Sequence, residues 1–289
     1  MVRGHDEAWS SQLLTLIRRA SFRSSSRSTL RLAPQTTAAP LAGMRVLVTG
    51  GSSGIGRAIA IAAARAGADV ALTYRVNERG AKDAAREIEG HGRRARTIRL
   101  DLADVASIEA LPGATRTALG GVDAWINNAG ADVLTGPAVS LPVVEKLDLL
   151  MRVDLRGTVL ASWQAAELMA SQDSGGVIIN MSWDHVLMGL AGIEAQLFAS
   201  VKGGVLAFSK SLARTVAPRI RVNVLAPGWI ETAYGNEVHE SVRRQIEATT
   251  PLARWGTPDD VAGAAVYLAS PAASFVTGQT MLVGGGVVM

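Results

Sequence analysis

A glycine-rich turn between a short apolar strand and a small-residue helix constrains the fold of this chain more than any other feature. The strand is expected at residues 45–49 and the helix at 57–66, and the turn between them reads TGGSSGIG from Thr49 to Gly56. Gly50 permits a tight turn, Gly54 lets the backbone approach a pyrophosphate, and Gly56 lets helix and strand pack closely. Amides at the start of the helix would face the phosphates. The segment therefore predicts a dinucleotide-binding loop.

The alternation of strand and helix continues along the chain. Further strands are expected at residues 69–74, 94–100, 124–127, 177–181, 221–225 and 280–283, and helices at 78–90, 105–119, 144–170, 199–216 and 258–269. Repeated strand-then-helix units imply parallel strands joined by right-handed helical crossovers. We expect one α/β domain with a single doubly wound, Rossmann-like parallel sheet and helices on both faces.

The first 43 residues differ in composition from the rest of the chain. They hold six arginines and only Asp6 and Glu7 as acids, a net charge of +4 that equals the formal charge of the whole chain. An Arg-rich, Ser-rich, acid-poor leader is typical of an organelle transit peptide, although a disordered leader explains the same residues. We expect a disordered or targeting extension over residues 1–43 and a dinucleotide-binding domain over 44–289.

Charge, cysteine and histidine content exclude several classes of function. Basic and acidic residues are equal in number from Met44 onward, so a nucleic-acid role has no electrostatic support. The chain has no cysteine, and its histidines (His5, His91, His185 and His239) lack metal-ligand spacing. No run of about 18 apolar residues occurs. We expect no nucleic acid, metal or membrane span, and a cytoplasmic location, or an organelle if residues 1–43 are a transit peptide.

Further segments follow the loop in the order typical of the short-chain dehydrogenase/reductase family, which the chain resembles over about residues 43–286. The loop has that family's spacing, Thr-Gly-x-x-x-Gly-x-Gly. The other matching segments are Asp101-Leu102, Asn127-Asn128-Ala129-Gly130, Arg221-Val222-Asn223, Pro227 to Thr232, Pro251 to Val261 and Ser274 to Gln279. The resemblance implies a nicotinamide cofactor, a small-molecule carbonyl or alcohol substrate, and a homotetramer or homodimer formed through the helices at 144–170 and 199–216.

The resemblance also implies the residues that bind the cofactor. They are Gly50, Ser52, Ser53, Gly54, Ile55, Gly56, Arg75, Asp101, Leu102, Asn128, Ala129, Gly130, Lys202, Pro227, Gly228, Ile230 and Thr232. At the end of the second strand an acid would bind the ribose 2′-hydroxyl, whereas a basic residue would accommodate a 2′-phosphate. Tyr74 is followed by Arg75, with no acid before Glu78, which favours NADP and leaves NAD possible. Ser53 is not the basic residue that many NADP-using relatives carry in the loop.

The catalytic positions of the family are altered in this chain. In relatives a tyrosine transfers the alcohol proton with help from a lysine, a serine polarises the carbonyl, and an asparagine at a helix kink holds a water that leads to the lysine. The matching residues here are Phe198, Lys202 and Asp154. The serine position falls on Trp183 when counted forward along the strand before it, and on His185 when counted back from Phe198. Only the lysine is kept.

Two interpretations of the altered site stay open. If the strand continues past Ser182, alternation places Trp183 and His185 on one face, so His185 would take the direction of the family's serine and could donate a proton at neutral pH. The alternative interpretation, which the residues favour slightly, is that His185 is a polar loop residue or a substrate contact. A carboxylate at Asp154 could pair with Lys202, which lacks a tyrosine partner. Tyr234 is a further possible hydroxyl, or a residue that lines the pocket.

We therefore expect an NAD(P)-dependent oxidoreductase with an atypical proton donor, in which Lys202, Asp154 and His185 are the catalytic residues. The alternative is a catalytically inactive, NADP-binding regulator or scaffold subunit. The substrate is not specified by the sequence, because the loop expected between Ile230 and Thr250, which would cover it, contains no diagnostic pattern.

Overall fold

A seven-stranded parallel sheet forms the centre of the molecule, seen here in a computed structural model that describes residues 39–233, 235 and 238–289. Its order is β3-β2-β1-β4-β5-β6-β7, so the chain builds outward from β1 in one direction and then, from β4, in the other. The strands are β1 (Arg45–Val48), β2 (Asp69–Tyr74), β3 (Ala95–Arg99), β4 (Ala124–Asn127), β5 (Gly176–Met181), β6 (Ile220–Pro227) and β7 (Thr280–Val283). A crevice at the carboxyl ends of β1 and β4, where the order reverses, is the usual ligand site of such a sheet.

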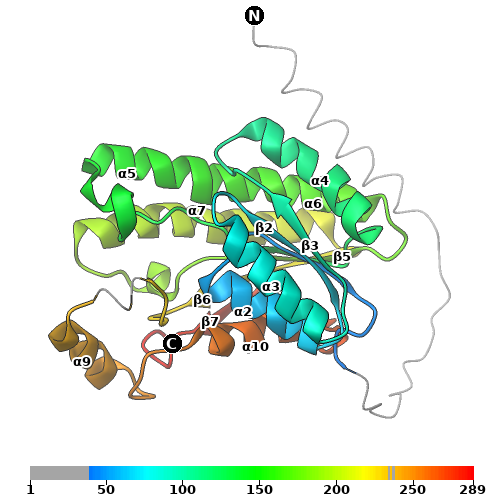
Figure 1. Cartoon of the computed structure of the whole chain (residues 1–289). Helices are drawn as coiled ribbons and strands as arrows, with labels where there is room; N and C mark the ends of the chain where they lie inside the picture. Colours follow the sequence, from blue (N-terminus) through cyan, green and yellow to red (C-terminus); the bar gives the residue numbers. More distant parts are fainter. Residues whose placement is uncertain (1–38, 234, 236–237) are drawn as a thin grey trace, which may run out of the picture.

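Helices cover both faces of this sheet (Figure 1). On one side lie α2 (Gly54–Arg65), α3 (Glu78–Gly90) and α10 (Pro258–Ala269), and on the other lie α4 (Val105–Leu119), α5 (Val143–Leu150), α6 (Thr158–Ala170) and α7 (Ile193–Val216). The doubly wound α/β fold that the sequence predicts is confirmed.

The alternation of side chains along each strand divides the core into two layers. In β1, Val46 and Val48 pack with α2 and α10, whereas Leu47 packs with α4, α6 and α7. In β4, Ile126 belongs to the first layer and Trp125 to the second. Strands that are buried on both faces therefore read as continuous apolar runs, as parallel strands usually do.

Two helices differ from their expected bounds. The helix expected over residues 144–170 is interrupted by a π-helical segment, Met151–Gly157, between α5 and α6. Extra residues in a helical turn commonly mark a functional position, and Asp154 lies within this one. Helix α7 begins at Ile193 rather than at Ala199, after Gly192 in a positive-φ conformation (φ 115°).

The packed structure begins before Met44. Leu41 is buried in the first core layer, and its N–H donates to the carbonyl of Ala66 at 2.8 Å. A core side chain therefore lies two residues before the domain boundary expected after residue 43. Residues 1–38, which make up most of the expected extension, lie outside the described residues.

Part of the segment from Ile230 to Thr250 is helical. Helix α9 (Glu240–Thr249) projects from the body of the molecule near the carboxyl ends of the strands and has no buried residue (Figure 1). None of the described helices combines the length and the apolar character that crossing a bilayer requires.

Candidate functional site

The glycine-rich turn is held against the end of β4 by hydrogen bonds. The Thr49 hydroxyl accepts the backbone N–H groups of Asn128 and Ala129, each at 3.0 Å, and the Asn128 side-chain amide donates to the carbonyls of Thr49 (3.0 Å) and Gly50 (3.3 Å). Gly50 has a positive φ of 69°, and a Cβ on Gly56 would lie 2.3 Å from the Gly50 carbonyl oxygen. Both positions therefore require glycine, as the loop motif predicts.

Helix α2 starts from this turn with its first amides open to a ligand. Its N-cap residue, Ser53, makes no side-chain capping bond, and no acid lies in the first turn. Ser53 and Gly54 are exposed, and a Cβ on Gly54 would meet only Thr232, at 3.9 Å. Uncapped amides and the helix dipole make such an end suitable for a phosphate group. These features fit the pyrophosphate of a dinucleotide.

The segment after β2 lies beside the same turn. Asn77 caps α3 by accepting the N–H of Gly80 at 3.0 Å, and its amide donates to the Ser52 carbonyl at 3.5 Å. Arg75, two residues earlier, is exposed. After β3, Leu102 is buried and Asp101 accepts the N–H of Ala103 at 2.9 Å. The chain therefore brings Arg75 to the side of the loop where the adenosine half of a dinucleotide would lie.

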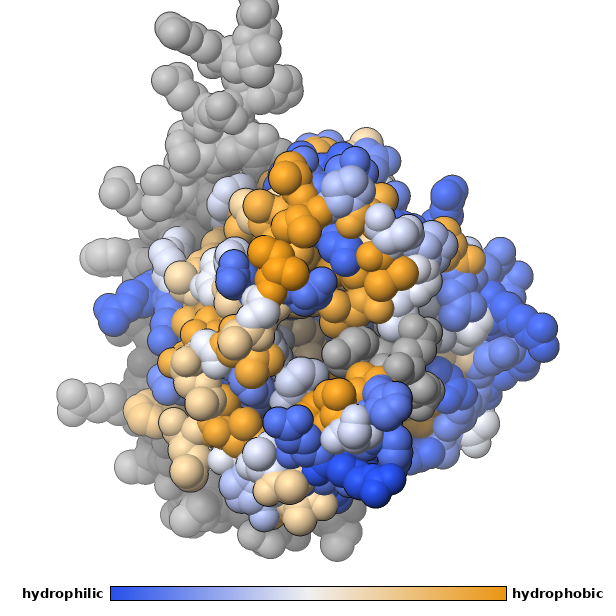
Figure 2. Space-filling view, turned by 90° about the vertical axis from the view of Figure 1, so that its left-hand side faces the viewer, coloured by the Kyte–Doolittle hydropathy of each residue, from blue (hydrophilic) through white to orange (hydrophobic). Residues whose placement is uncertain are grey.

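A cavity of about 660 Å³ opens at the carboxyl ends of the strands. In Figure 2 hydrophobic residues surround a hollow on the face that carries this edge of the sheet. Of the residues predicted to bind a cofactor, those that line the cavity are Ile55, Asn128, Lys202, Pro227, Gly228, Ile230 and Thr232. Phe198 lines it too, one helical turn before Lys202 on α7. The structure thus joins the end of the glycine-rich turn and the expected catalytic lysine in one cavity.

Lys202 is held at the cavity by Asp154. Its ammonium nitrogen lies 2.8 Å from Asp154 Oδ2, and Asp154 Oδ1 accepts the backbone N–H of Ala131 at 2.7 Å. Asp154 is buried and Lys202 is nearly so. A Cβ on Gly130 would lie 2.7 Å from the same carboxylate, so a glycine is needed where the loop passes it. The pairing of these two side chains is the one expected from the sequence.

His185 and Trp183 do not continue the strand as expected. Strand β5 ends at Met181, and Asp184–Leu187 forms a turn of 3₁₀-helix, so strand parity cannot be carried to residue 185. Trp183 lines the cavity; His185 does not. The His185 ring is 3% exposed, stacks on Trp183 with 4.9 Å between ring centroids, and meets Trp229 edge to face at 5.7 Å. The geometry therefore places His185 behind Trp183 rather than on the cavity wall.

A buried carboxylate accompanies this histidine. Asp184 Oδ1 lies 2.6 Å from His185 Nδ1, and Asp184 is fully buried. Its other oxygen, Oδ2, has no hydrogen-bond partner among the described residues. Gly228 and Gly284 pass close to that oxygen, since a Cβ on either would lie within 2.6 Å of it. Tyr234, the other possible proton donor, lies outside the described residues.

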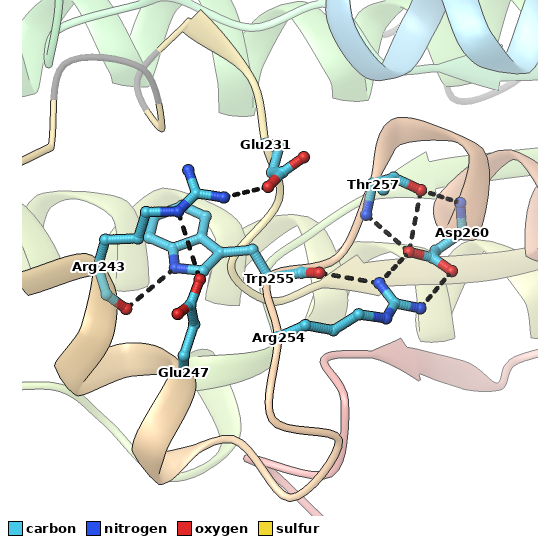
Figure 3. Close-up of polar contacts among 7 residues, drawn as sticks. All are labelled: Glu231, Arg243, Glu247, Arg254, Trp255, Thr257 and Asp260. Atoms are coloured by element: carbon cyan, nitrogen blue, oxygen red, sulfur yellow. Dashed lines mark hydrogen bonds and ion pairs between the residues drawn. The ribbon is translucent and has the colours of Figure 1, made fainter. Parts of the chain in front are cut away.

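Trp255 forms part of the cavity wall and is fixed from behind by a polar network (Figure 3). The Arg243 guanidinium lies 5.4 Å from the Trp255 ring centroid and pairs with Glu231 and Glu247. Arg254 binds Asp260 through two hydrogen bonds, of 2.7 and 2.9 Å, and the hydrogen bonds from Arg254 hold the pKa of Asp260 well below its usual range. Asp260 also closes a capping box with Thr257 at the start of α10. The indole is therefore a rigid wall.

Lys146 is a cavity residue that the sequence did not indicate. It lies on α5, is 6% exposed and lines the cavity together with Glu194 of α7. Lysine is rare in this arginine-rich chain, but that scarcity does not indicate where a lysine will lie in the fold. Its burial follows from the packing of α5 against α7, which sequence periodicity does not specify.

Comparison with known proteins agrees with this geometry. Residues 50–288 match the family model described as enoyl-(acyl carrier protein) reductase. The chain is 36% identical over 252 residues to 3beta-hydroxysteroid dehydrogenase 1 of Eggerthella lenta, a match that covers 86% of this chain and 95% of that one.

Two solved structures share the fold and were determined with nicotinamide cofactors. A blue fluorescent protein from a metagenomic library, in complex with NADPH, superposes with a TM-score of 0.77 at 35% identity, covering 86% of this chain and 100% of that one. A 7α-hydroxysteroid dehydrogenase complexed with NADH and 7-oxo glycochenodeoxycholic acid has a TM-score of 0.78 at 31% identity, covering 87% and 96%. This chain belongs to the short-chain dehydrogenase/reductase family of NAD(P)-dependent oxidoreductases.

Proposed function

We propose that this protein reduces a small-molecule carbonyl compound, or oxidises the corresponding alcohol, with NADPH favoured over NADH. Its site would lack the family's tyrosine, serine and asparagine, with Phe198, Trp183 and Asp154 in their places. Trp183 suits the serine position better than His185 does, because it lines the cavity. The observation that carries the proposal is the Lys202–Asp154 ion pair, which keeps an ammonium group on the cavity wall with no tyrosine partner among the described residues.

Separate residues would bind the cofactor and stabilise the reacting carbonyl group. The turn from Gly50 to Gly56 and the first amides of α2 would hold the pyrophosphate, and Arg75 would face the adenosine ribose. When bound, NADPH supplies the hydride. Lys202 would hold the nicotinamide ribose and present its ammonium to the carbonyl oxygen, where a fixed positive charge stabilises developing negative charge. Asp154 keeps that ammonium in position.

The proton has two proposed sources. His185 can act only if Trp183 moves aside or a chain of water connects the imidazole to the cavity, because its ring does not line the wall. Lys202 does line the wall and can release a proton directly, so the geometry favours it over His185. General acid catalysis contributes about 10²- to 10⁴-fold to such reactions.

One observation favours a second function, that of a cofactor-binding regulator or scaffold subunit. Phe198 brings an apolar ring to the cavity, and neither tyrosine nor histidine is among the described residues that line it. A site with a complete phosphate loop and no phenol can bind a nucleotide without turning over. Family resemblance would allow either kind of protein to form a homodimer or homotetramer through α6 and α7, which analytical ultracentrifugation tests.

Single-turnover kinetics distinguish the two functions. NADPH is titrated by fluorescence, and its oxidation is then followed against a panel of ketones and quinones for the wild type, His185→Ala, Lys202→Met and the control Lys210→Met, which replaces an exposed lysine on the same helix. We expect turnover in the wild type and in the control, and a loss of at least about 10²-fold in Lys202→Met. Tight NADPH binding without oxidation on any compound would refute the enzymatic proposal. Unchanged turnover in His185→Ala would remove His185 as the donor.

Cofactor preference is tested at Arg75. A charge-assisted hydrogen bond to the 2′-phosphate contributes about 1.5–3 kcal/mol, so Arg75→Ala should weaken NADPH at least about 10-fold while leaving NADH unchanged. Arg86→Ala, which alters an exposed arginine paired with Asp83 on α3, is the control. Equal loss of both cofactors would contradict the assignment.

A further inference from the structure

The cavity contains a second lysine for which the proposed chemistry has no use. Lys146 of α5 is 6% exposed and lines the same cavity as Lys202. Burial of an ammonium group is costly unless hydrogen bonds replace the lost water. The contacts of Lys146 therefore indicate whether the protein itself supplies the hydrogen bonds that its ammonium group needs.

The described residues offer the Lys146 ammonium group few polar contacts. Among the described residues, the nearest carboxylate oxygen is Glu194 Oε1, which lies 3.8 Å from its ammonium nitrogen, beyond hydrogen-bond distance, and the Glu194 side chain is 47% exposed. No side-chain hydrogen bond from Lys146 is formed within the part of the chain that the structure describes. By contrast, the Lys202 ammonium is 2.8 Å from a buried carboxylate. Among the described residues, Lys146 is thus the cavity lysine whose ammonium group has no hydrogen-bonded carboxylate.

The remaining walls indicate what kind of molecule would use those donors. Large apolar surfaces face the cavity from Trp183, Trp229, Trp255, Phe198 and Leu134. Asp154 already neutralises Lys202, and Glu194 is the one carboxylate among the described residues of the lining. An apolar chamber with an under-satisfied ammonium group suits a ligand that has a hydrophobic body and one anionic group.

Position along α7 sets the length of that ligand. Glu194, Phe198 and Lys202 are spaced by four residues and lie on one face of the helix. The Cα atoms of Glu194 and Lys202 are therefore separated by about 12 Å along the axis, at 1.5 Å per residue. Because Lys146 sits beside Glu194, a molecule that reaches both lysines must be longer than a 2-oxo acid, in which the carbonyl and the carboxylate are adjacent.

We propose that Lys146 determines substrate specificity by binding the carboxylate of a hydrophobic oxo-acid whose ketone lies at the other end, near Lys202. This rests on the proposed oxidoreductase function, since it names the class of carbonyl compound that the same site would reduce. Glu194 competes with the substrate for Lys146, and its exposed carboxylate is able to swing toward solvent when the ligand enters.

A matched pair of ketones tests the carboxylate site separately from catalysis. The probes are 6-acetyl-2-naphthoate and 6-acetyl-2-naphthamide, which share the ring and the ketone and differ in charge. Their dissociation constants are measured by calorimetry in the presence of NADP⁺, for the wild type, Lys146→Met, Lys146→Arg and the control Lys210→Met. NADPH oxidation by each ketone is recorded in parallel.

We expect the naphthoate to bind the wild type at least about 10-fold more tightly than the amide, as a charge-assisted hydrogen bond implies. Lys146→Met should abolish this preference without affecting the amide, Lys146→Arg should retain most of it, and Lys210→Met should leave it unchanged. Equal affinity for acid and amide in the wild type, or an unchanged preference in Lys146→Met, would overturn the proposal.

Glu194→Gln provides a test that does not depend on whether Lys146→Met folds. Removing the competing carboxylate should tighten naphthoate binding several-fold and leave the amide alone; weaker or unchanged naphthoate binding would count against the proposal. Selective naphthoate binding without NADPH oxidation would leave the carboxylate site standing while the oxidoreductase function fails. If both ketones oxidise NADPH and bind the wild type with equal affinity, the oxidoreductase function stands and the carboxylate site fails.

Discussion

The ammonium nitrogen of Lys202 lies 2.8 Å from Asp154 Oδ2, and this contact joins α7 to the π-helical segment between α5 and α6. The same carboxylate accepts the Ala131 N–H, so it also fixes the loop that follows β4. One buried side chain therefore links α7, the π-helical segment and the loop after β4. This explains how the site can keep its shape with phenylalanine at residue 198.

Replacing Asp154 should destabilise the protein strongly. Asp154→Ala leaves the Lys202 ammonium buried without a partner, and breaking a buried ion pair in this way costs about 3–5 kcal/mol of unfolding free energy. Urea unfolding followed by tryptophan fluorescence measures the change. Asp83→Ala, which removes an exposed pair with Arg86, is the control and should cost less than about 1 kcal/mol. The double variant Asp154→Ala/Lys202→Met should recover part of the lost free energy of unfolding. If Asp154→Ala and the control Asp83→Ala reduced that free energy equally, this account would be contradicted.

Gly56 should tolerate no side chain. In Gly56→Ala the new Cβ would lie 2.3 Å from the Gly50 carbonyl oxygen and 2.4 Å from the Asn128 amide nitrogen, so the phosphate loop must shift. Overpacking of this kind costs about 1–3 kcal/mol, and we expect NADPH affinity to fall at least about 10-fold. Gly113→Ala in α4, where a Cβ meets nothing within 4 Å, should instead stabilise the protein by about 0.5–1 kcal/mol. Thermal unfolding and NADPH titration of both variants check the pair; normal binding by Gly56→Ala would be inconsistent with a cofactor loop.

The sheet was predictable because its information is local. Apolar runs bounded by turn residues gave the strands within about two residues, and the glycines of the first turn, Gly50 and Gly56, meet contacts that only glycine allows. Helix α9 was missed because it buries no residue and is stabilised by pairs such as Arg244 with Glu240 on its own surface. Its two apolar residues at helical spacing, Val242 and Ile246, form a face that the rest of the protein does not bury.

The site was predictable where the family resemblance assigned residues whose charges need one another. The pairing of Lys202 with Asp154 could be inferred, since a buried ammonium needs a carboxylate. The position of His185 could not, because the strand ends at Met181 and a 3₁₀ turn redirects the chain. The place of Lys146 in the cavity could not be predicted either. Its burial comes from the packing of α5 on α7, which the spacing of residues in the sequence does not specify.

Stability should depend on the ionisation of Asp260 at acid pH. Hydrogen bonds from Arg254 and from the Thr257 backbone lower the pKa of Asp260, so its folded-state value lies below the unfolded value of about 3.9. The stabilising contribution is therefore complete above about pH 4 and is lost as the pH falls toward the folded-state pKa. Asp260→Asn should cost about 1–2 kcal/mol at pH 7, because a neutral amide replaces the carboxylate that accepts charge-assisted hydrogen bonds from Arg254, and the difference from wild type should shrink below pH 4.

Urea unfolding from pH 7 to pH 2.5 measures this dependence. Asp259→Asn, which changes an exposed carboxylate in the same helical turn, is the control and should cost less than about 1 kcal/mol, the contribution of the helix dipole alone. A difference between Asp260→Asn and wild type that persists unchanged at the lowest pH would show that ionisation of Asp260 is not its source.

Restoring a phenol at residue 198 should accelerate hydride transfer. Phe198 lines the cavity one turn before Lys202 on the same face of α7, so the hydroxyl of Phe198→Tyr would enter open space beside an ammonium group. Proton donation by a positioned acid contributes about 10²- to 10⁴-fold, and we expect a single-turnover rate at least about 10-fold above wild type with NADPH affinity unchanged. Phe208→Tyr adds a hydroxyl on the same helix, where the ring contacts Trp163 rather than the cavity, and should leave the rate as it is.

If Phe198→Tyr gains turnover that the wild type lacks, the natural protein is the cofactor-binding form and phenylalanine is the residue that prevents its turnover. If neither turns over while both bind NADPH, loss of the tyrosine is not the change that decides activity, and the altered positions at Trp183 and Asp154 must account for it.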